Sequence, residues 1–123
     1  MSKRPVVGIT MGDPVGIGPE IILQALLQPA VHDLCKPVIL GDVNLLSKLN
    51  VFQKTNLHIR SIKAPGAGSY EKGTVNVVSL SALRLDQVRP GRPTRETGRA
   101  MVTYITTGIE LAMTGQTQGL ITC

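Results

Sequence analysis

The chain has 123 residues, of which 42% are hydrophobic and 17% are charged, and its formal net charge is +5. This balance excludes an intrinsically disordered chain, which has few apolar residues and dense charge, and it is typical of one globular domain. No apolar run approaches the roughly 18–20 residues that span a bilayer, and the apolar stretch behind Lys3 and Arg4 is too short for a signal peptide. We therefore expect a cytoplasmic protein without a membrane partner.

Strands and helices are expected to alternate along the first half of the chain. Residues Pro5–Thr10 form a short apolar run without alternation, which is typical of a strand buried on both faces of a parallel sheet. A glycine-rich turn follows, and the apolar spacing over Pro19–Gln28 predicts a helix with Gly18 as its cap. The same alternation returns as a predicted strand over Pro37–Gly41 and a short helix over Val43–Leu49.

The second half continues with further strands and one long helix. Residues Leu57–Ile62 and Val75–Leu80 are rich in β-branched side chains and predict two strands. Three proline and glycine residues between Arg84 and Thr94 exclude regular structure there, and Thr94 can cap a helix over Arg95–Met113. The final run, Gly119–Cys123, again predicts a buried strand.

These elements predict an α/β protein with a mostly parallel sheet and flanking helices. We expect the long helix to pack on the sheet through one apolar stripe, with two glycines allowing a close approach; the residues are Met101, Ile105, Ile109, Ala112, Gly98 and Gly108. In open sheets of this kind, ligands bind in the turns beyond the carboxyl ends of the strands. Because the sequence stops directly after such a strand, we expect residues 1–123 to be the amino-terminal part of a longer protein, with a fold incomplete at its carboxyl end.

The glycine-rich turn between the first strand and the first helix is the segment richest in functional signals. Its glycines, at positions 12, 16 and 18, permit close approach of a ligand or of another backbone, and the helix that follows directs its free amides into the turn. Two common phosphate loops do not fit, because no lysine follows the glycines and Ile21 stands where a dinucleotide loop has its third glycine. A tight structural turn and a ligand-lining turn both remain open.

Positive charge is concentrated in the irregular segment and in the start of the long helix. The arginines of this cluster are Arg84, Arg89, Arg92, Arg95 and Arg99. A solvated basic surface and a site for a small anion are the main alternatives. Nucleic-acid binding is disfavoured, because no aromatic side chain for base stacking lies between Tyr70 and Tyr104.

The cysteines and histidines predict neither a disulfide framework nor a metal site within this sequence. Cys35 and Cys123 lack the spacing of a zinc motif, and we interpret both as inert thiols. We interpret His32 and His58 as ordinary surface or partly buried histidines.

The motif Ile9-Thr10-Met11-Gly12-Asp13-Pro14-Val15-Gly16-Ile17-Gly18-Pro19-Glu20-Ile21 resembles the opening of the 4-hydroxythreonine-4-phosphate dehydrogenase family, which makes a precursor of pyridoxal phosphate. Three further segments are similar to the same family: Val38–Asp42, Gly91–Thr94 and Gly119–Thr122. The resemblance covers this chain from end to end, but it covers only about the first third of such an enzyme. It implies a fold like that of isocitrate and isopropylmalate dehydrogenases, whose openings are also similar.

The resemblance implies an NAD-dependent and metal-dependent oxidation of 4-phosphohydroxy-L-threonine, followed by decarboxylation, in a homodimer. The divalent metal, Zn, Mg, Mn or Co, would polarise the alcohol and its carbonyl product, and its ligands are expected beyond residue 123. No catalytic residue is therefore expected in this chain, which alone would be inactive. Gly12, Asp13 and Pro14 are the candidate neighbours of the cofactor or substrate, and Arg92 and Arg95 the candidates near phosphate.

Two other functions remain open from the sequence. A sibling enzyme would perform the same chemistry on D-threonate or D-erythronate 4-phosphate, because the residues that distinguish these substrates lie later in the family's sequence. Alternatively, the 123 residues would act as a small, non-catalytic binding module.

Overall fold

The computed structural model describes residues 4–123, which fold around a five-stranded sheet with the strand order β3-β4-β2-β1-β5. The strands are β1 (Val6–Thr10), β2 (Lys36–Gly41), β3 (His58–Ile62), β4 (Thr74–Ser79) and β5 (Gly119–Thr122). Every neighbouring pair runs parallel, which confirms the predicted α/β fold with a parallel sheet. The five predicted strands are all present, with ends that differ by one residue at most.

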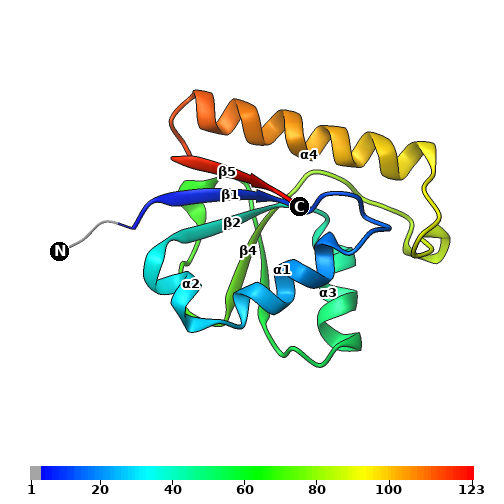
Figure 1. The fold of residues 1–123 in the computed structure, drawn as a ribbon, viewed down its shortest axis with the longest axis horizontal. Coiled ribbons are helices and arrows are strands. Elements are labelled where there is room, and N and C mark those ends of the chain that lie inside the picture. The colour runs from blue at the N-terminus through cyan, green and yellow to red at the C-terminus, as the bar shows by residue number, and fades with distance from the viewer. Residues whose placement is uncertain (1–3) are drawn as a thin grey trace.

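Helices cover both faces of this sheet. They are α1 (Gly18–Leu26), α2 (Pro29–Leu34), α3 (Val43–Phe52) and α4 (Arg95–Met113), with single 3₁₀ turns η1 (Pro65–Ala67) and η2 (Leu85–Gln87). Figure 1 shows α1, α2 and α3 on one side of the sheet and α4 on the other. Within residues 4–123, no helix is both long and apolar enough to cross a bilayer.

The first predicted helix differs from the structure at both ends. It begins one residue earlier, so that Gly18 lies inside the helix and Ile17 is the cap, without a capping side chain. It also ends at Leu26, and Pro29 then starts α2. The cause is local, because the residue before a proline avoids the helical conformation, and Gln28 is extended with φ −80° and ψ 116°.

The central strands supply most of the buried core. Val38, Ile39 and Leu40 of β2 are fully buried, as are Val75 and Val77 of β4. The continuous apolar sequence of β2 is what a parallel strand requires, because helices cover it on both faces. In β4 the buried Asn76 interrupts the apolar run and forms hydrogen bonds with the Ser69 backbone.

The predicted packing face of α4 is confirmed at Gly108 but wrong for Gly98 and for the apolar stripe. The residues of α4 that are buried are Thr97, Ala100, Tyr104 and Gly108. Gly108 meets the sheet so closely that a Cβ there would lie 2.7 Å from the Leu120 side chain, whereas Gly98 has nothing within 4 Å. Ile109, expected against the sheet, is 47% exposed. Two small residues and one hydrogen-bonded tyrosine allow a closer approach than the bulkier stripe beside them.

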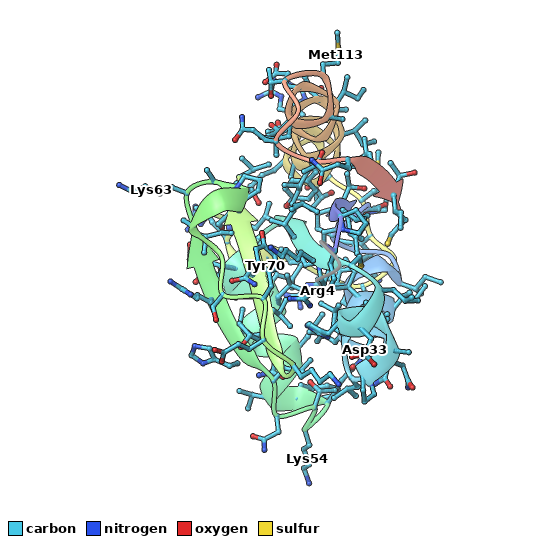
Figure 2. The ribbon with its side chains drawn as sticks, turned by 90° about the vertical axis from the view of Figure 1, so that its left-hand side faces the viewer. Arg4, Asp33, Lys54, Lys63, Tyr70 and Met113 are labelled. Atoms are coloured by element: carbon cyan, nitrogen blue, oxygen red, sulfur yellow. The ribbon has the colours of Figure 1, made fainter. Side chains whose placement is uncertain are left out.

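Hydrogen bonds from Arg4 connect the segments that precede β1, β2 and β4. The Arg4 guanidinium donates hydrogen bonds to the carbonyl oxygens of His32 and Tyr70, which lie on separate elements, and Figure 2 shows Arg4 beside Tyr70. His32 is 2% exposed, so the expectation of a surface or partly buried histidine is wrong for this residue, while His58 is exposed as expected. The cause is that α2 places His32 against β4, with Nε2 3.4 Å from the Thr74 carbonyl oxygen.

Candidate functional site

The loops that follow β1, β2 and β4 meet the end of β5 at one edge of the sheet. This is the carboxyl edge of all these strands, since they run parallel. Figure 1 shows the carboxyl terminus beside the loop between β1 and α1. Open parallel sheets bind their ligands at this edge, at the point where successive connections pass to opposite sides. Here the chain reaches β2 on one side of β1 and later returns to β5 on the other.

The β1–α1 turn is held by its own hydrogen bonds. Asp13 accepts from the Val15 amide through Oδ1 at 3.0 Å, and its carbonyl oxygen accepts from the Gly16 amide at 2.9 Å. Gly12 has φ +75°, and a Cβ on it would lie 2.4 Å from the Cys123 carbonyl oxygen. A Cβ on Gly18 would lie 2.2 Å from the Met11 carbonyl oxygen. These two glycines are therefore required by close packing of the protein's own backbone.

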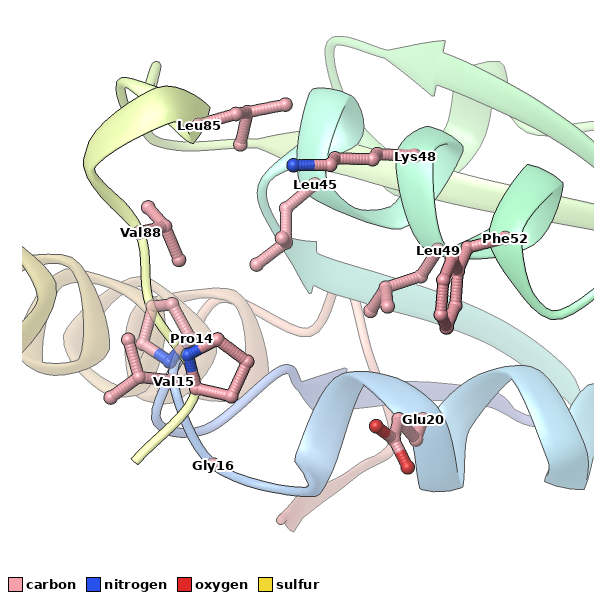
Figure 3. Close-up of a pocket in the computed structure, with 11 residues that line it drawn as sticks. Pro14, Val15, Gly16, Glu20, Leu45, Lys48, Leu49, Phe52, Leu85 and Val88 are labelled. Atoms are coloured by element: carbon pink, nitrogen blue, oxygen red, sulfur yellow. The ribbon is translucent and has the colours of Figure 1, made fainter. Parts of the chain in front are cut away.

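A cavity of about 210 Å³ opens beside this turn, between the start of α1, one side of α3 and the segment from η2 to Pro90 (Figure 3). It is lined by Pro14, Val15, Gly16, Glu20, Leu45, Lys48, Leu49, Phe52, Leu85, Val88 and Pro90. Of the three predicted cofactor neighbours, Pro14 lines the cavity, whereas Gly12 and Asp13 shape the turn behind it. Ligand pockets usually measure about 300–1,000 Å³, so this cavity would hold one part of a ligand.

The two loops beside this cavity are joined by a backbone hydrogen bond. The Gly91 amide donates to the Val15 carbonyl oxygen at 2.8 Å, which fixes the segment before α4 against the β1–α1 turn. The irregular segment predicted over residues 84–94 is therefore part of the same edge.

Asp42 is the residue at this edge whose role the sequence analysis missed. Its side chain is fully buried at the end of β2, and Oδ1 accepts from the amides of Asn44 and Leu45 at 3.0 Å, which caps α3. Oδ2 accepts from the Ser81 hydroxyl at 2.8 Å and from the Leu83 amide at 2.9 Å. An aspartate directly between a buried strand and a helix was the available signal, because aspartate is a preferred helix cap.

Tyr104 extends this network to α4. Its hydroxyl lies 2.6 Å from the Ser81 oxygen, and it donates, since the Ser81 proton is directed to Asp42. The pKa of Tyr104 is raised to about 12, because the raising effect of burial, with a smaller one from the nearby Asp42, outweighs the lowering effect of the Ser81 hydrogen bond. The network thus connects β2, the loop after β4 and α4 at the edge where the candidate site lies.

The structure does not bring Arg92 and Arg95 together in one pocket. Both are exposed, and neither makes an ion pair within residues 4–123. Arg95 lines a hollow at the start of α4 together with Arg84, Thr94 and Thr97, but Arg92 does not. Thr94 caps α4 by accepting from the Thr97 amide at 3.1 Å, as its position in the sequence predicts. The positive charges of Arg92 and Arg95 at the carboxyl edge are therefore exposed to solvent.

The described residues do not fit a resident metal ion. Within residues 4–123, no three histidine, cysteine, aspartate or glutamate side chains lie close enough together to bind one. Burial raises the pKa of the Cys35 and Cys123 thiols, which lowers the thiolate fraction needed for metal binding. For NAD, the fit is partial, because the turn presents Pro14 at a small, mainly apolar cavity whose charged lining residues are Glu20 and Lys48.

The fold and this edge define an open, doubly wound parallel α/β protein. The family model for the pyridoxal phosphate biosynthetic protein PdxA matches residues 33–123. The chain belongs to this family, as the resemblance of its opening motif predicted.

Individual relatives extend the match to nearly the whole chain. The 4-hydroxythreonine-4-phosphate dehydrogenase of Desulforapulum autotrophicum is 46% identical over 98% of this chain and 36% of its own length. A Clostridium botulinum protein provisionally named D-threonate 4-phosphate dehydrogenase is 31% identical over 99% of this chain and 36% of its own. The crystal structure of a 4-hydroxythreonine-4-phosphate dehydrogenase from Burkholderia phymatum superposes with a TM-score of 0.93 at 31% identity, covering 98% of this chain and 36% of that one. The chain thus spans about a third of the length of these relatives.

Proposed function

We propose that the full-length protein, meaning this chain with the polypeptide that completes its relatives, is a dehydrogenase that acts on 4-phosphohydroxy-L-threonine in pyridoxal phosphate biosynthesis. It would transfer a hydride to NAD, with a divalent metal as Lewis acid, and release carbon dioxide from the β-keto acid product. The observation that carries this proposal is the similarity, over 98% of the chain, to a relative named for this activity.

Residues 1–123 would form one wall of the active-site cleft. Gly12 and Asp13 would fix the turn that places Pro14 at the cavity, next to the cofactor. Arg92 and Arg95 would attract the phosphate of the substrate or of NAD from the solvated edge. As the family resemblance implies, the metal ligands and the catalytic groups are expected in the remaining polypeptide, and the 123-residue chain alone is expected to be inactive.

A second substrate is supported by a specific observation. The relative named for D-threonate 4-phosphate matches 99% of this chain, although its identity of 31% is lower than the 46% of the first. D-Erythronate 4-phosphate is the related alternative. The two kinds of enzyme would share the wall formed by this chain and differ in the remaining polypeptide.

The experiment is a comparison of turnover by the full-length protein on these phosphates, followed as NADH absorbance. We expect higher kcat/KM on 4-phosphohydroxy-L-threonine, loss of activity on chelation, and recovery on adding a divalent metal. Preference for a threonate or erythronate phosphate would replace the first substrate by the second. Absence of NADH with every one of these phosphates would contradict the dehydrogenase proposal and favour the binding module.

The proposed role of the arginines has a matched control. Replacing Arg92 and Arg95 together by alanine should raise the KM for substrate or for NAD, because both side chains are exposed at the carboxyl edge. Arg60→Ala removes an equally exposed arginine from β3 and should leave both constants unchanged. Unchanged constants in the double variant would show that the arginines are merely solvated. The homodimer that the family resemblance implies is tested separately, by sedimentation of the full-length protein.

A further inference from the structure

Two cationic side chains line one hollow at the amino ends of the strands, at the opposite edge of the sheet from the cavity beside Pro14. Arg4 lies before β1, and Lys36 is the first residue of β2. The hollow measures about 610 Å³ and opens to solvent, and Pro5 and Gln118 complete its lining. Figure 2 views the molecule from this edge, with Arg4 near the centre. This amino-edge hollow has the volume of a small-ligand site.

The guanidinium group of Arg4 is held in place and keeps free donors. The side chain is half-buried, and its two terminal nitrogens donate to the carbonyl oxygens of His32 and Tyr70. A guanidinium group carries five N–H donors, so other donors remain after these two hydrogen bonds. Both acceptors are uncharged, and the positive charge of Arg4 is therefore not neutralised by them. A fixed guanidinium group with free donors suits the oxygens of a phosphate or carboxylate group.

The ammonium group of Lys36 adds a second positive charge to the hollow. Its nitrogen lies 5.9 Å from the centre of the Tyr70 ring, which attracts the cation through the ring face. The same residue whose carbonyl oxygen accepts from Arg4 thus also positions the ammonium group of Lys36. An ammonium group has three donors and no acceptor, so it can only donate to a ligand in the hollow.

Neither of these charges forms an ion pair within residues 4–123. The ion pair present in this part of the chain joins Lys72 to Asp33 at 3.0 Å, so the carboxylate of Asp33 is already in use. The charge of Arg4 is effective nearby, because it lowers the pKa of the Cys35 thiol, although burial has the larger and raising effect. Two like charges that share a hollow repel each other, and a bound anion would remove this repulsion.

The remaining walls of the hollow are uncharged and are fixed by hydrogen bonds. The Gln118 side chain accepts from the Val6 amide at 2.8 Å and donates to the Gly115 carbonyl oxygen at 3.3 Å. The Pro5 carbonyl oxygen accepts from the Lys36 amide at 2.8 Å. The lining residues therefore include two cations and no carboxylate, and their backbone is already in place before a ligand binds.

We propose that the amino-edge hollow is a binding site for a phosphoryl group, supplied by inorganic phosphate or by a small phosphate monoester. A phosphate dianion balances the charges of both cations, whereas a carboxylate balances one. Its several oxygens can accept from Arg4 and from Lys36 at the same time. The bound anion would connect the segment before β1 to the start of β2 and stabilise this edge of the sheet.

Lysine acetylation tests the site in the full-length protein. A limiting amount of acetylating reagent is added with inorganic phosphate, with glycerol 1-phosphate or with sodium chloride of equal ionic strength, and each lysine is followed by peptide mass spectrometry. Relative to chloride, we expect both phosphates to slow the labelling of Lys36 about threefold once about two thirds of the sites are filled. Lys63, an exposed lysine that points outward in Figure 2, is the internal control and should react equally in all three solutions.

The labelling rates also identify the source of the phosphoryl group. Protection of Lys36 at a lower concentration of glycerol 1-phosphate supports the proposal with a phosphorylated metabolite as ligand, and protection at a lower concentration of inorganic phosphate supports it with the free ion. Equal labelling of Lys36 in all three solutions would overturn the proposal, as would equal slowing of Lys36 and Lys63. A Lys36 that is unreactive in chloride would show that other polypeptide covers the hollow, and this would also overturn it.

A pair of matched variants gives a second test without chemical labelling. Lys36→Gln removes one charge from the hollow, and Lys63→Gln removes one from an exposed site outside it. Millimolar phosphate should raise the thermal unfolding midpoint of the full-length parent and of Lys63→Gln equally, and clearly less that of Lys36→Gln, because a ligand stabilises the folded state that binds it. The same rise in all three proteins would contradict the proposal. Neither test uses turnover, so the proposed dehydrogenase activity and this site can fail independently.

Discussion

The buried carboxyl group of Asp42 gives the most direct test of how the carboxyl edge is held together. We predict that Asp42→Ala destabilises the protein more than any exposed acidic substitution. The side chain is fully buried and accepts four hydrogen bonds, two from amides at the start of α3 and two from the loop after β4.

The expected loss of stability follows from the polar groups that are left without a partner when each hydrogen bond is removed. Loss of the cap of α3 costs about 1 kcal/mol, with a range of roughly 0.5–2. Loss of Oδ2 leaves the buried Leu83 amide without an acceptor, which costs about 1–3 kcal/mol. The Ser81 hydroxyl keeps Tyr104 as a partner, so its cost is smaller. We therefore expect a loss of about 3 kcal/mol, a large part of the roughly 5–15 kcal/mol that stabilises a typical domain.

The assay is urea unfolding followed by circular dichroism, with two companion variants. Asp42→Asn keeps one oxygen as an acceptor but directs an amide towards one set of donors, so its loss should be intermediate. Asp33→Ala is the control, because its partner Lys72 lies 3.0 Å away on the surface and both side chains are about 60% exposed. An exposed pair of this kind contributes about 0–1 kcal/mol. If Asp42→Ala cost no more than Asp33→Ala, the reasoning about the network would be refuted.

Other predictions concern a glycine and a tyrosine. Gly12→Ala should lower the free energy of unfolding by at least about 1–2 kcal/mol because of the positive φ of Gly12 alone. Gly98→Ala, at a position in open space on α4, should raise the free energy of unfolding by about 0.5–1 kcal/mol. Urea midpoints that move in the same direction for both variants would contradict this reasoning. For Tyr104, the pKa is raised from 10.0 to about 12, so the associated stability should be complete below pH 10.0 and be lost as the pH rises through about 12. Ultraviolet titration should show the late ionisation of both tyrosines in the parent, and in Tyr104→Phe only that of Tyr70, whose pKa burial also raises. Tyr104→Phe should also cost about 1 kcal/mol, because it removes the hydrogen bond to Ser81.

Local sequence determined the order and type of the elements except for the short helix α2, which the sequence analysis did not predict. The continuous apolar runs at β1 and β2 are typical of parallel strands covered on both faces, and the fold class follows from the alternation of strands with helices. Thr94 marked the start of α4, since a hydroxyl cap acts within a few residues, and the structure places Gly115, with φ +80°, just after the helix end. The opening motif also identified the family without any tertiary information.

Tertiary structure decided which face of each element is used. The α4 stripe of Met101, Ile105 and Ile109 is as apolar as a core stripe, yet the helix packs through Tyr104 on the face of the predicted Gly108. The hydrogen bond between Tyr104 and Ser81, which selects this face, joins residues distant in sequence. The same holds for the glycine turn. Sequence left open whether Gly12 admits a ligand or a backbone, and the answer lies in the Cys123 carbonyl oxygen, which is distant in sequence. Local patterns act over a few bonds, whereas packing and burial depend on the residues that folding brings together.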